Sequence, residues 1–217
     1  MVQQPMTTDV LTLAQMLSPS FPVGAFAYSH GLETAIDQGL VTDADSLQMW
    51  LNDLLLYGSG YGDAVLLNMA FAASASDIQS VDMQARAVAA TKERLQETDL
   101  QGAAFCVAAN ALWSLKLRGL TYPVAIGYTA RALGFDPELT TAMYLQAFVG
   151  NLCGVAMRAV PLGQTDGQQV QKALQSVCLD VARKTQGAGA DDLHSSTFMS
   201  DIVAMQHETK YARVFRT

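Results

Sequence analysis

The sequence predicts an all-α protein, a single-domain bundle of roughly eight to ten helices. Its apolar residues are of the helix-forming kind, with 32 Ala and 26 Leu against 17 Val and only 4 Ile. Ala and Leu favour helices, whereas β-branched residues fit strands better. Apolar residues also recur with helical spacing, and no sustained alternation of period two occurs. The 217 residues are enough to bury one substantial core.

Composition and charge exclude two classes of protein. The chain is 50% hydrophobic and 15% charged, against about 25% charged residues in a typical soluble domain. Disordered chains have the opposite profile. The chain is also acidic, with a formal charge of −7, whereas proteins that bind a phosphate backbone carry an excess of basic residues. We therefore expect no nucleic-acid partner. The low charge indicates either a membrane protein or a surface that partners cover.

The first expected helix begins at Thr8 or Asp9 and ends at Leu17, because Pro19 and Pro22 follow. A second is expected over Ala27–Gln38, with Gly39 as its C-terminal stop.

Thr42, with Asp45 three residues later, is expected to cap a third helix with an apolar stripe that reaches Leu55. The glycine-rich stretch 58–62 is expected to be a flexible turn, after which Asp63 caps a helix over Ala64–Ala75.

Asp77 begins a long helical region that ends near Gly119. Tyr122-Pro123 then starts a helix that runs to Leu133. The stretch Asp136-Pro137-Glu138 combines a cap, a first-turn proline and an acid at the positive end of the helix dipole, and predicts a helix to about Arg158. Asp166 caps a last amphipathic helix, and residues 185–200 are expected to form a polar surface loop.

The stretch Leu139–Met157 has 19 uncharged residues, the length of a membrane span, and contains the close-packing pair Gly150 and Gly154. Because it also carries Thr140, Thr141, Gln146 and Asn151, we expect a buried central helix and no membrane. The N-terminus shows no secretory signal, and the three cysteines lie in apolar helical patterns. We therefore expect reduced core thiols and a cytoplasmic protein.

Motifs for catalysis or cofactor binding are weak. No phosphate-binding loop occurs, and Gly58-x-Gly60-x-Gly62 lacks the dinucleotide-binding spacing. His207-Glu208 has Tyr211 where a zinc protease needs its second histidine. His30 is expected on a helix surface or interface, and Asp191-Asp192-x-His194 is expected to be solvated. We assign no catalytic residue and no stably bound cofactor, and leave the metal ligands open.

Three segments carry more specificity than core packing needs: 18–33, 158–168 and 205–217. Within the first, Gly31 costs about 1 kcal/mol relative to Ala in a helix, which indicates another backbone or a partner lying against it. The last interleaves Tyr211 and Phe215 with Arg213 and Arg216, residue types that are enriched at interface hot spots. Composition alone leaves a docking segment and a frayed tail equally open.

Taken together, these segments closely resemble the UreF-type urease accessory proteins. The family's N-terminal Ser-Pro-x-x-Pro-x-Gly-x-Phe-x-x-Ser-x-Gly-Leu-Glu stretch is matched by Ser18, Pro19, Pro22, Gly24, Phe26, Ser29, Gly31, Leu32 and Glu33. Its Pro-Leu-Gly-Gln-Thr-x-Gly-Gln turn is matched by Pro161–Thr165, Gly167 and Gln168. Its terminal His-Glu-Thr-x-Tyr-x-Arg-Leu-Phe-Arg is matched by His207, Glu208, Thr209, Tyr211, Arg213, Phe215 and Arg216. The chain departs from the family at Gln206, at Val214 and over 94–102.

The resemblance implies an all-α homodimer that catalyses nothing alone. It implies pairing with a UreD/UreH-type accessory protein, recruitment of the GTPase UreG, and delivery of nickel to apo-urease, with the nickel handled by the complex. A domain over 1–204 then carries a docking tail over 205–217. The partner-binding residues implied are Phe21, Pro22, Gly24, Tyr28, Ser29, Gly31, Glu33, Gln164, Thr165, His207, Glu208, Tyr211, Arg213, Phe215 and Arg216.

Two alternatives remain. The protein could activate or check UreG through an exposed arginine such as Arg213 or Arg216. It could instead be a helical small-molecule enzyme, which predicts a pocket with a convergent acid or histidine.

Overall fold

The structure, a computed structural model, describes residues 7–216 and confirms the all-α prediction. This part of the chain forms ten α-helices, two short 3₁₀ turns and no strand. The helices are α1 (Thr7–Met16), α2 (Leu32–Asp37), α3 (Ala44–Tyr57), α4 (Ser59–Ala72), α5 (Ile78–Ala87), α6 (Lys92–Trp113), α7 (Tyr122–Leu133), α8 (Pro137–Ala159), α9 (Gln164–Lys184) and α10 (Phe198–His207), and the 3₁₀ turns are η1 (Ala25–Ala27) and η2 (Ala190–Asp192).

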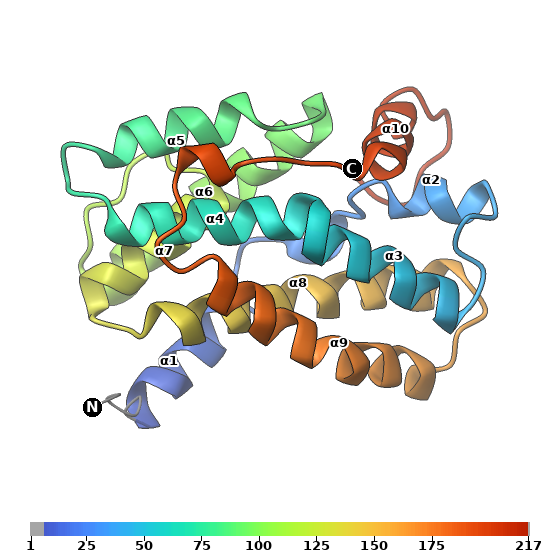
Figure 1. Cartoon of the computed structure of the whole chain (residues 1–217), viewed down its shortest axis with the longest axis horizontal. Helices are drawn as coiled ribbons and strands as arrows, with labels where there is room; N and C mark the ends of the chain where they lie inside the picture. The colour runs from blue at the N-terminus through green and yellow to red at the C-terminus, as the bar shows by residue number, and fades with distance from the viewer. Residues whose placement is uncertain (1–6, 217) are drawn as a thin grey trace.

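The long helix α8 is the central element of the bundle. It packs along α9 and also contacts α2, α3, α4 and α7 (Figure 1). By length and composition α8 could cross a membrane, but 61% of its most apolar window is buried inside the protein. The expectation of a buried central helix is therefore confirmed. Its start is also as predicted, because the Asp136 side chain accepts the Leu139 N–H at 2.7 Å.

The three cysteines lie in this core as free thiols. Burial raises the pKa of Cys153 and of Cys178 to about 12, and it also raises the pKa of Cys106. A thiol with a raised pKa carries little thiolate at neutral pH, so these side chains act as small apolar residues.

The predicted helix over Ala27–Gln38 is wrong in its first half. The chain makes only the turn η1, then an irregular link, and α2 begins at Leu32. His30 and Gly31 have φ values of 53° and 76°, in the left-handed region, so a right-handed helix cannot pass through them. The predicted stop is correct, since Gly39 has a φ of 73° directly after α2.

The expected flexible turn over 58–62 is also wrong. Only Gly58 separates α3 from α4, and the other residues of this stretch form the first turn of α4. Asp63 consequently lies inside the helix instead of capping it, and its residue is only 5% exposed.

Smaller differences concern helix ends. Asp43, not Thr42, caps α3, through a reciprocal pair with Ser46. Helix α9 begins at Gln164, and Asp166 accepts the Gly163 N–H from within its first turn. The region after Asp77 is two helices, α5 and α6.

Helix α10 has no counterpart among the expected elements. The polar loop was expected to continue to Ser200, but α10 begins at Phe198 and ends at His207. It therefore crosses the expected boundary between the domain and the tail at 204/205. Figure 1 shows α10 beside α2, at the end of the molecule where the chain terminates.

The close packing of α4 against α7 depends on Gly127. A Cβ atom at this position would lie 2.1 Å from the carbonyl oxygen of Leu67, which belongs to the backbone of α4. Gly154 in α8 is different, because a Cβ there would meet nothing within 4 Å.

We expect Gly127→Ala to lower the free energy of unfolding by roughly 1–3 kcal/mol, because α4 and α7 must move apart. The matched variant Gly154→Ala should raise it by about 0.5–1 kcal/mol, because alanine favours a helix over glycine. Urea unfolding followed by circular dichroism measures both. Equal effects in the two variants would contradict the assigned close approach.

Candidate functional site

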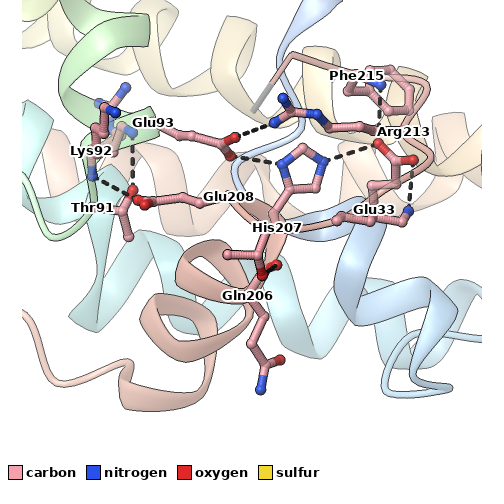
Figure 2. A network of polar contacts seen from close by, with 12 residues as sticks. Glu33, Thr91, Lys92, Glu93, Gln206, His207, Glu208, Arg213 and Phe215 are labelled. Atoms are coloured by element: carbon pink, nitrogen blue, oxygen red, sulfur yellow. Dashed lines mark hydrogen bonds and ion pairs between the residues drawn. The ribbon is translucent and has the colours of Figure 1, made fainter.

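The C-terminal segment folds back onto its own chain. After α10 ends at His207, the chain crosses over the starts of α2 and α6, as Figure 2 shows. The Arg216 N–H donates to the Ala27 carbonyl oxygen at 2.8 Å, so the backbone of the tail is also attached to η1.

His207 is the first residue that holds this arrangement. Its side chain is fully buried between two carboxylates, with Nδ1 2.7 Å from Glu93 Oε2 and Nε2 3.2 Å from Glu33 Oε2 (Figure 2). An ionised carboxylate only accepts, so both contacts form together when the ring carries both N–H groups. The imidazole thereby joins α2 to α6 through the end of α10.

Glu33 accepts hydrogen bonds from four residues near the end of the chain. Besides His207, its carboxylate accepts the backbone N–H groups of Val214 (2.9 Å) and Phe215 (3.0 Å) and the Lys210 ammonium (2.8 Å). Burial acts to raise the pKa of the Glu33 carboxyl, but the bonds from Lys210, Val214, Phe215 and His207 lower it to about 2. Glu33 is therefore an ionised acceptor that orders the tail.

Two further ion pairs complete the contact. The Arg213 guanidinium lies 2.5 Å from Glu93 Oε1, and Lys210 reaches Asp37 as well as Glu33. We call Glu33, Glu93, His207, Lys210 and Arg213 the tail clamp.

Phe215 provides the apolar part of the docking. Its ring is only 4% exposed and belongs to the hydrophobic core, and the Arg158 guanidinium lies over it at 4.5 Å from the ring centroid. Arg158 also donates to the Phe26 carbonyl oxygen at 3.1 Å. Gly31 lies against α10, where a Cβ would come within 2.9 Å of Ala204. The prediction that another backbone lies against Gly31 is confirmed.

A second buried polar network starts one residue along α6 from the clamp. Arg94 binds both oxygens of Asp63, at 2.7 and 2.6 Å, and the Tyr144 hydroxyl donates to Asp63 Oδ2 at 2.7 Å. Glu97 lies 2.8 Å from His30 Nε2. Burial and the Asp63 charge together raise the pKa of Tyr144, so this phenol stays a neutral donor.

Of these side chains, those of His30, Asp63, Arg94 and Glu97 line a cavity of about 260 Å³ between α4, α6 and α10. His30 lies in the link before α2 and its side chain is only 8% exposed, so the expectation that it lies on a helix surface is wrong, whereas the alternative of an interface stays a prediction. Asp191 and Asp192 form η2, and the ring of the nearby His194 lies 4.9 Å from that of Tyr61.

Among residues 7–216, no group of three or more histidine, cysteine or acidic side chains is placed to hold a metal ion.

The structure brings most of the implied partner-binding residues together but buries many of them. Inside the chain are Phe21, Tyr28, Ser29, Gly31, Glu33, His207 and Phe215. On the surface or partly exposed are Pro22, Gly24, Glu208, Tyr211, Arg213 and Arg216, as are Gln164 and Thr165 at the start of α9. Thr217, the last residue of the expected tail, lies outside the described part.

Phe21 is a core residue, stacked on Trp113 and close to Phe105. Gln164 and Thr165 share no hydrogen bond or ion pair with the tail clamp within residues 7–216. Pro22, Gly24 and Tyr28 line one cavity together with Phe215 and Arg216. Glu33 is hydrogen-bonded to His207 and to the tail backbone.

Sequence reasoning missed Glu93, Arg158 and the Asp63–Arg94 pair. An acid in the first turn of a helix is common because it suits the helix dipole, so nothing local marks Glu93 as the partner of His207. The Asp63–Arg94 pair was missed because the sequence pattern around Asp63 is typical of a helix cap. Segment 94–102, which departs from the family pattern, supplies Arg94 and Glu97 to the buried network.

The fold and site define an all-α protein whose buried charges hold the end of the chain against its body. Comparison with known proteins then identifies the family. The UreF family model matches residues 41–175. The urease accessory protein UreF of Roseobacter denitrificans is 50% identical over 213 residues, covering 98% of this chain and 96% of the relative. That of Ruegeria pomeroyi is 45% identical over 214 residues, covering 98% and 99%. The chain belongs to the UreF family of urease accessory proteins, and the resemblance is confirmed.

The ionised Glu33 makes tail docking depend on pH. Because its pKa is lowered from 4.5 to about 2, its contribution of up to roughly 3 kcal/mol is complete above pH 4.5 and is lost as the pH falls toward 2. We expect the amides of Val214 and Phe215 to lose protection from hydrogen exchange over this range. In Glu33→Gln these two amides should already exchange freely at pH 6. Asp37→Asn is the control, because it alters only an exposed partner of Lys210, and its amides should be protected as in the wild type. Protection that persists in Glu33→Gln would contradict the assignment.

Removing the buried ring should also detach the tail. We expect Phe215→Ala to lose roughly 3–5 kcal/mol of packing, which exceeds what a short segment can retain, so residues 210–216 should exchange like an unfolded peptide. Val214→Ala is the matched control, since Val214 is 81% exposed. Hydrogen exchange read by mass spectrometry on both variants tests this, and intact protection in Phe215→Ala would refute it.

Proposed function

We propose that this chain is a non-catalytic adaptor in urease maturation. With a UreD/UreH-type partner it recruits the GTPase UreG and helps to insert nickel into apo-urease, acting as a homodimer in the cytoplasm. The observation that carries the proposal is the ordered tail. Its inner face is fixed by the tail clamp, while Tyr211 is fully exposed and Val214 is 81% exposed on its outer face. An ordered segment with exposed apolar side chains is preorganised for binding, because little entropy remains to be lost.

The helix that precedes the tail supports this proposal. Phe198, Met199, Ile202 and Met205 of α10 are each 46–72% exposed and follow one another at helical spacing. An exposed apolar stripe of this kind is a typical protein-interaction surface, and methionine adapts well to a partner. We assign α10 and the tail together to the UreD/UreH-type partner.

The buried charged side chains Asp63, Arg94 and Glu97 of the cavity between α4, α6 and α10 favour an adaptor over an enzyme. Arg94 pairs with Asp63 and lies 3.7 Å from Glu97, which also contacts His30, so these three charges already have partners inside the chain. The Tyr144 phenol, with its raised pKa, is not activated as a base. A small-molecule enzyme would instead present an acid or base free to meet a substrate.

The same reasoning favours recruitment of UreG over activation by an arginine finger. Arg213 is bound to Glu93, and the Arg216 side chain hydrogen-bonds to Tyr28. A finger must reach the phosphates of the nucleotide, and Arg213 would have to leave Glu93 to do so.

The adaptor proposal is tested by removing the tail. We expect a chain truncated before Thr209 to lose co-purification with the UreD/UreH-type partner while its helical circular dichroism is retained, because α1–α10 remain. Phe198→Ser/Ile202→Ser should weaken the complex, whereas Leu179→Ser in α9, 48% exposed, should not. Undiminished binding of the truncated chain would refute the docking role.

A further inference from the structure

The end of the tail lies in a groove that extends along both of its sides. Two adjoining cavities of about 590 Å³ each share the lining residues Tyr28, Leu100, Val214, Phe215 and Arg216. We call this feature the terminal groove. One end of it reaches Lys92 and Glu208, and the other reaches Pro22, Phe26 and Arg158.

The charge of the terminal groove is opposite to that of the whole protein. Its lining includes four cations, Lys92, Arg158, Arg213 and Arg216, but only two carboxylates, Glu93 and Glu208. The chain as a whole has a formal charge of −7. A cationic groove in an acidic protein is a local feature that attracts a local anionic group.

The carboxylates of the groove are already engaged, and the cations are largely not. Glu93 is bound by His207 and Arg213, and Glu208 accepts the backbone N–H of Lys92 at 2.9 Å. Among residues 7–216, Lys92, Arg158 and Arg216 have no carboxylate within 4 Å. Arg158 faces a ring and carbonyl oxygens, and Arg216 a phenol. Three positive charges are thus left for a ligand to neutralise.

Apolar side chains lie between these charges. Phe26 is 64% exposed, Leu100 44% and Val214 81%, and all three line the groove. A ligand that satisfies the groove therefore needs carboxylates at both ends and an apolar side chain between them. A peptide offers this combination, whereas a polyanion such as a nucleic acid offers no apolar group and is repelled by the rest of the chain.

We propose that the terminal groove binds an acidic segment of a partner protein, in which carboxylates flank an apolar side chain. The segment contacts Lys92 at one end and Arg158 at the other, with Arg216 in the part that the two cavities share. The proposal rests on the adaptor role, because it gives the chemistry of one segment that the adaptor takes up. It differs from the adaptor role because binding in the groove depends on the positive charge of Lys92, Arg158 and Arg216.

The test is a titration of the full-length protein with two synthetic peptides, one with carboxylates flanking Leu-Phe and one with lysines in their place, followed by amide chemical shifts. We expect the acidic peptide alone to shift the amides of Leu100 and Val214, with affinity falling as salt rises from about 50 to about 300 mM. The variants Lys92→Glu and Arg216→Glu should bind about tenfold or more weakly. Both should fold, since the contacts of these residues with Glu208 and Ala27 use backbone N–H groups.

Lys172→Glu is the matched control, because Lys172 is exposed on α9 and lines neither end of the groove. Equal binding of both peptides, no loss in the reversed variants, or preferential binding of anionic lipid vesicles would overturn the proposal. Co-purification with the UreD/UreH-type partner separates it from the adaptor role. A partner that is lost on truncation but binds both reversed variants fully leaves the adaptor role standing and overturns the groove. A wild-type chain that binds the acidic peptide but does not co-purify with a UreD/UreH-type partner leaves the groove proposal standing and overturns the adaptor role.

Discussion

The buried carboxylate of Glu33 is the constraint on which this end of the molecule depends. A buried charge costs several kcal/mol unless it is paired and hydrogen-bonded. Every partner that satisfies Glu33 comes from the last eleven residues of the chain: His207, Lys210 and the amides of Val214 and Phe215. The start of α2 and the end of the chain therefore stabilise one another, because the tail supplies the donors that the buried Glu33 carboxylate needs.

Helix α6 connects this clamp to the interior. Its neighbouring residues Glu93 and Arg94 take part in different networks, the first with His207 and Arg213, the second with Asp63 of α4. Glu97, one turn further along α6, holds His30. The link before α2 is thus fixed directly to α6 through His30, which offsets the cost of the positive φ at that residue. A partner that pulls on the tail acts on α2 and α6 at once.

Local signals predicted the helices well where the determinant is local. The cap Asp136 with Pro137 and the stop Gly134 act within one turn, so the end of α7 and the start of α8 follow from a few adjacent residues. Asp63 was misassigned because its partner Arg94 is 31 residues away. The same applies to Glu93 and His207, which are 114 residues apart. The motifs showed that segments 18–33 and 205–217 matter, but only the structure shows that they bind each other.

The surface of the protein carries even less charge than the low charge of the sequence suggests, because several acids are buried. Glu33, Asp63, Asp82, Glu93 and Glu97 are each at most 7% exposed, so a quarter of the 20 acidic residues do not contribute to the surface. Burying carboxylates in this way requires cations, and Arg86, Arg94, Lys210 and Arg213 are used for it. The cations that remain near the tail face no such acid. The folding of this chain around internal ion pairs therefore leaves positive charge without a carboxylate partner, next to exposed apolar groups, at one end of the molecule, where both are accessible to another molecule.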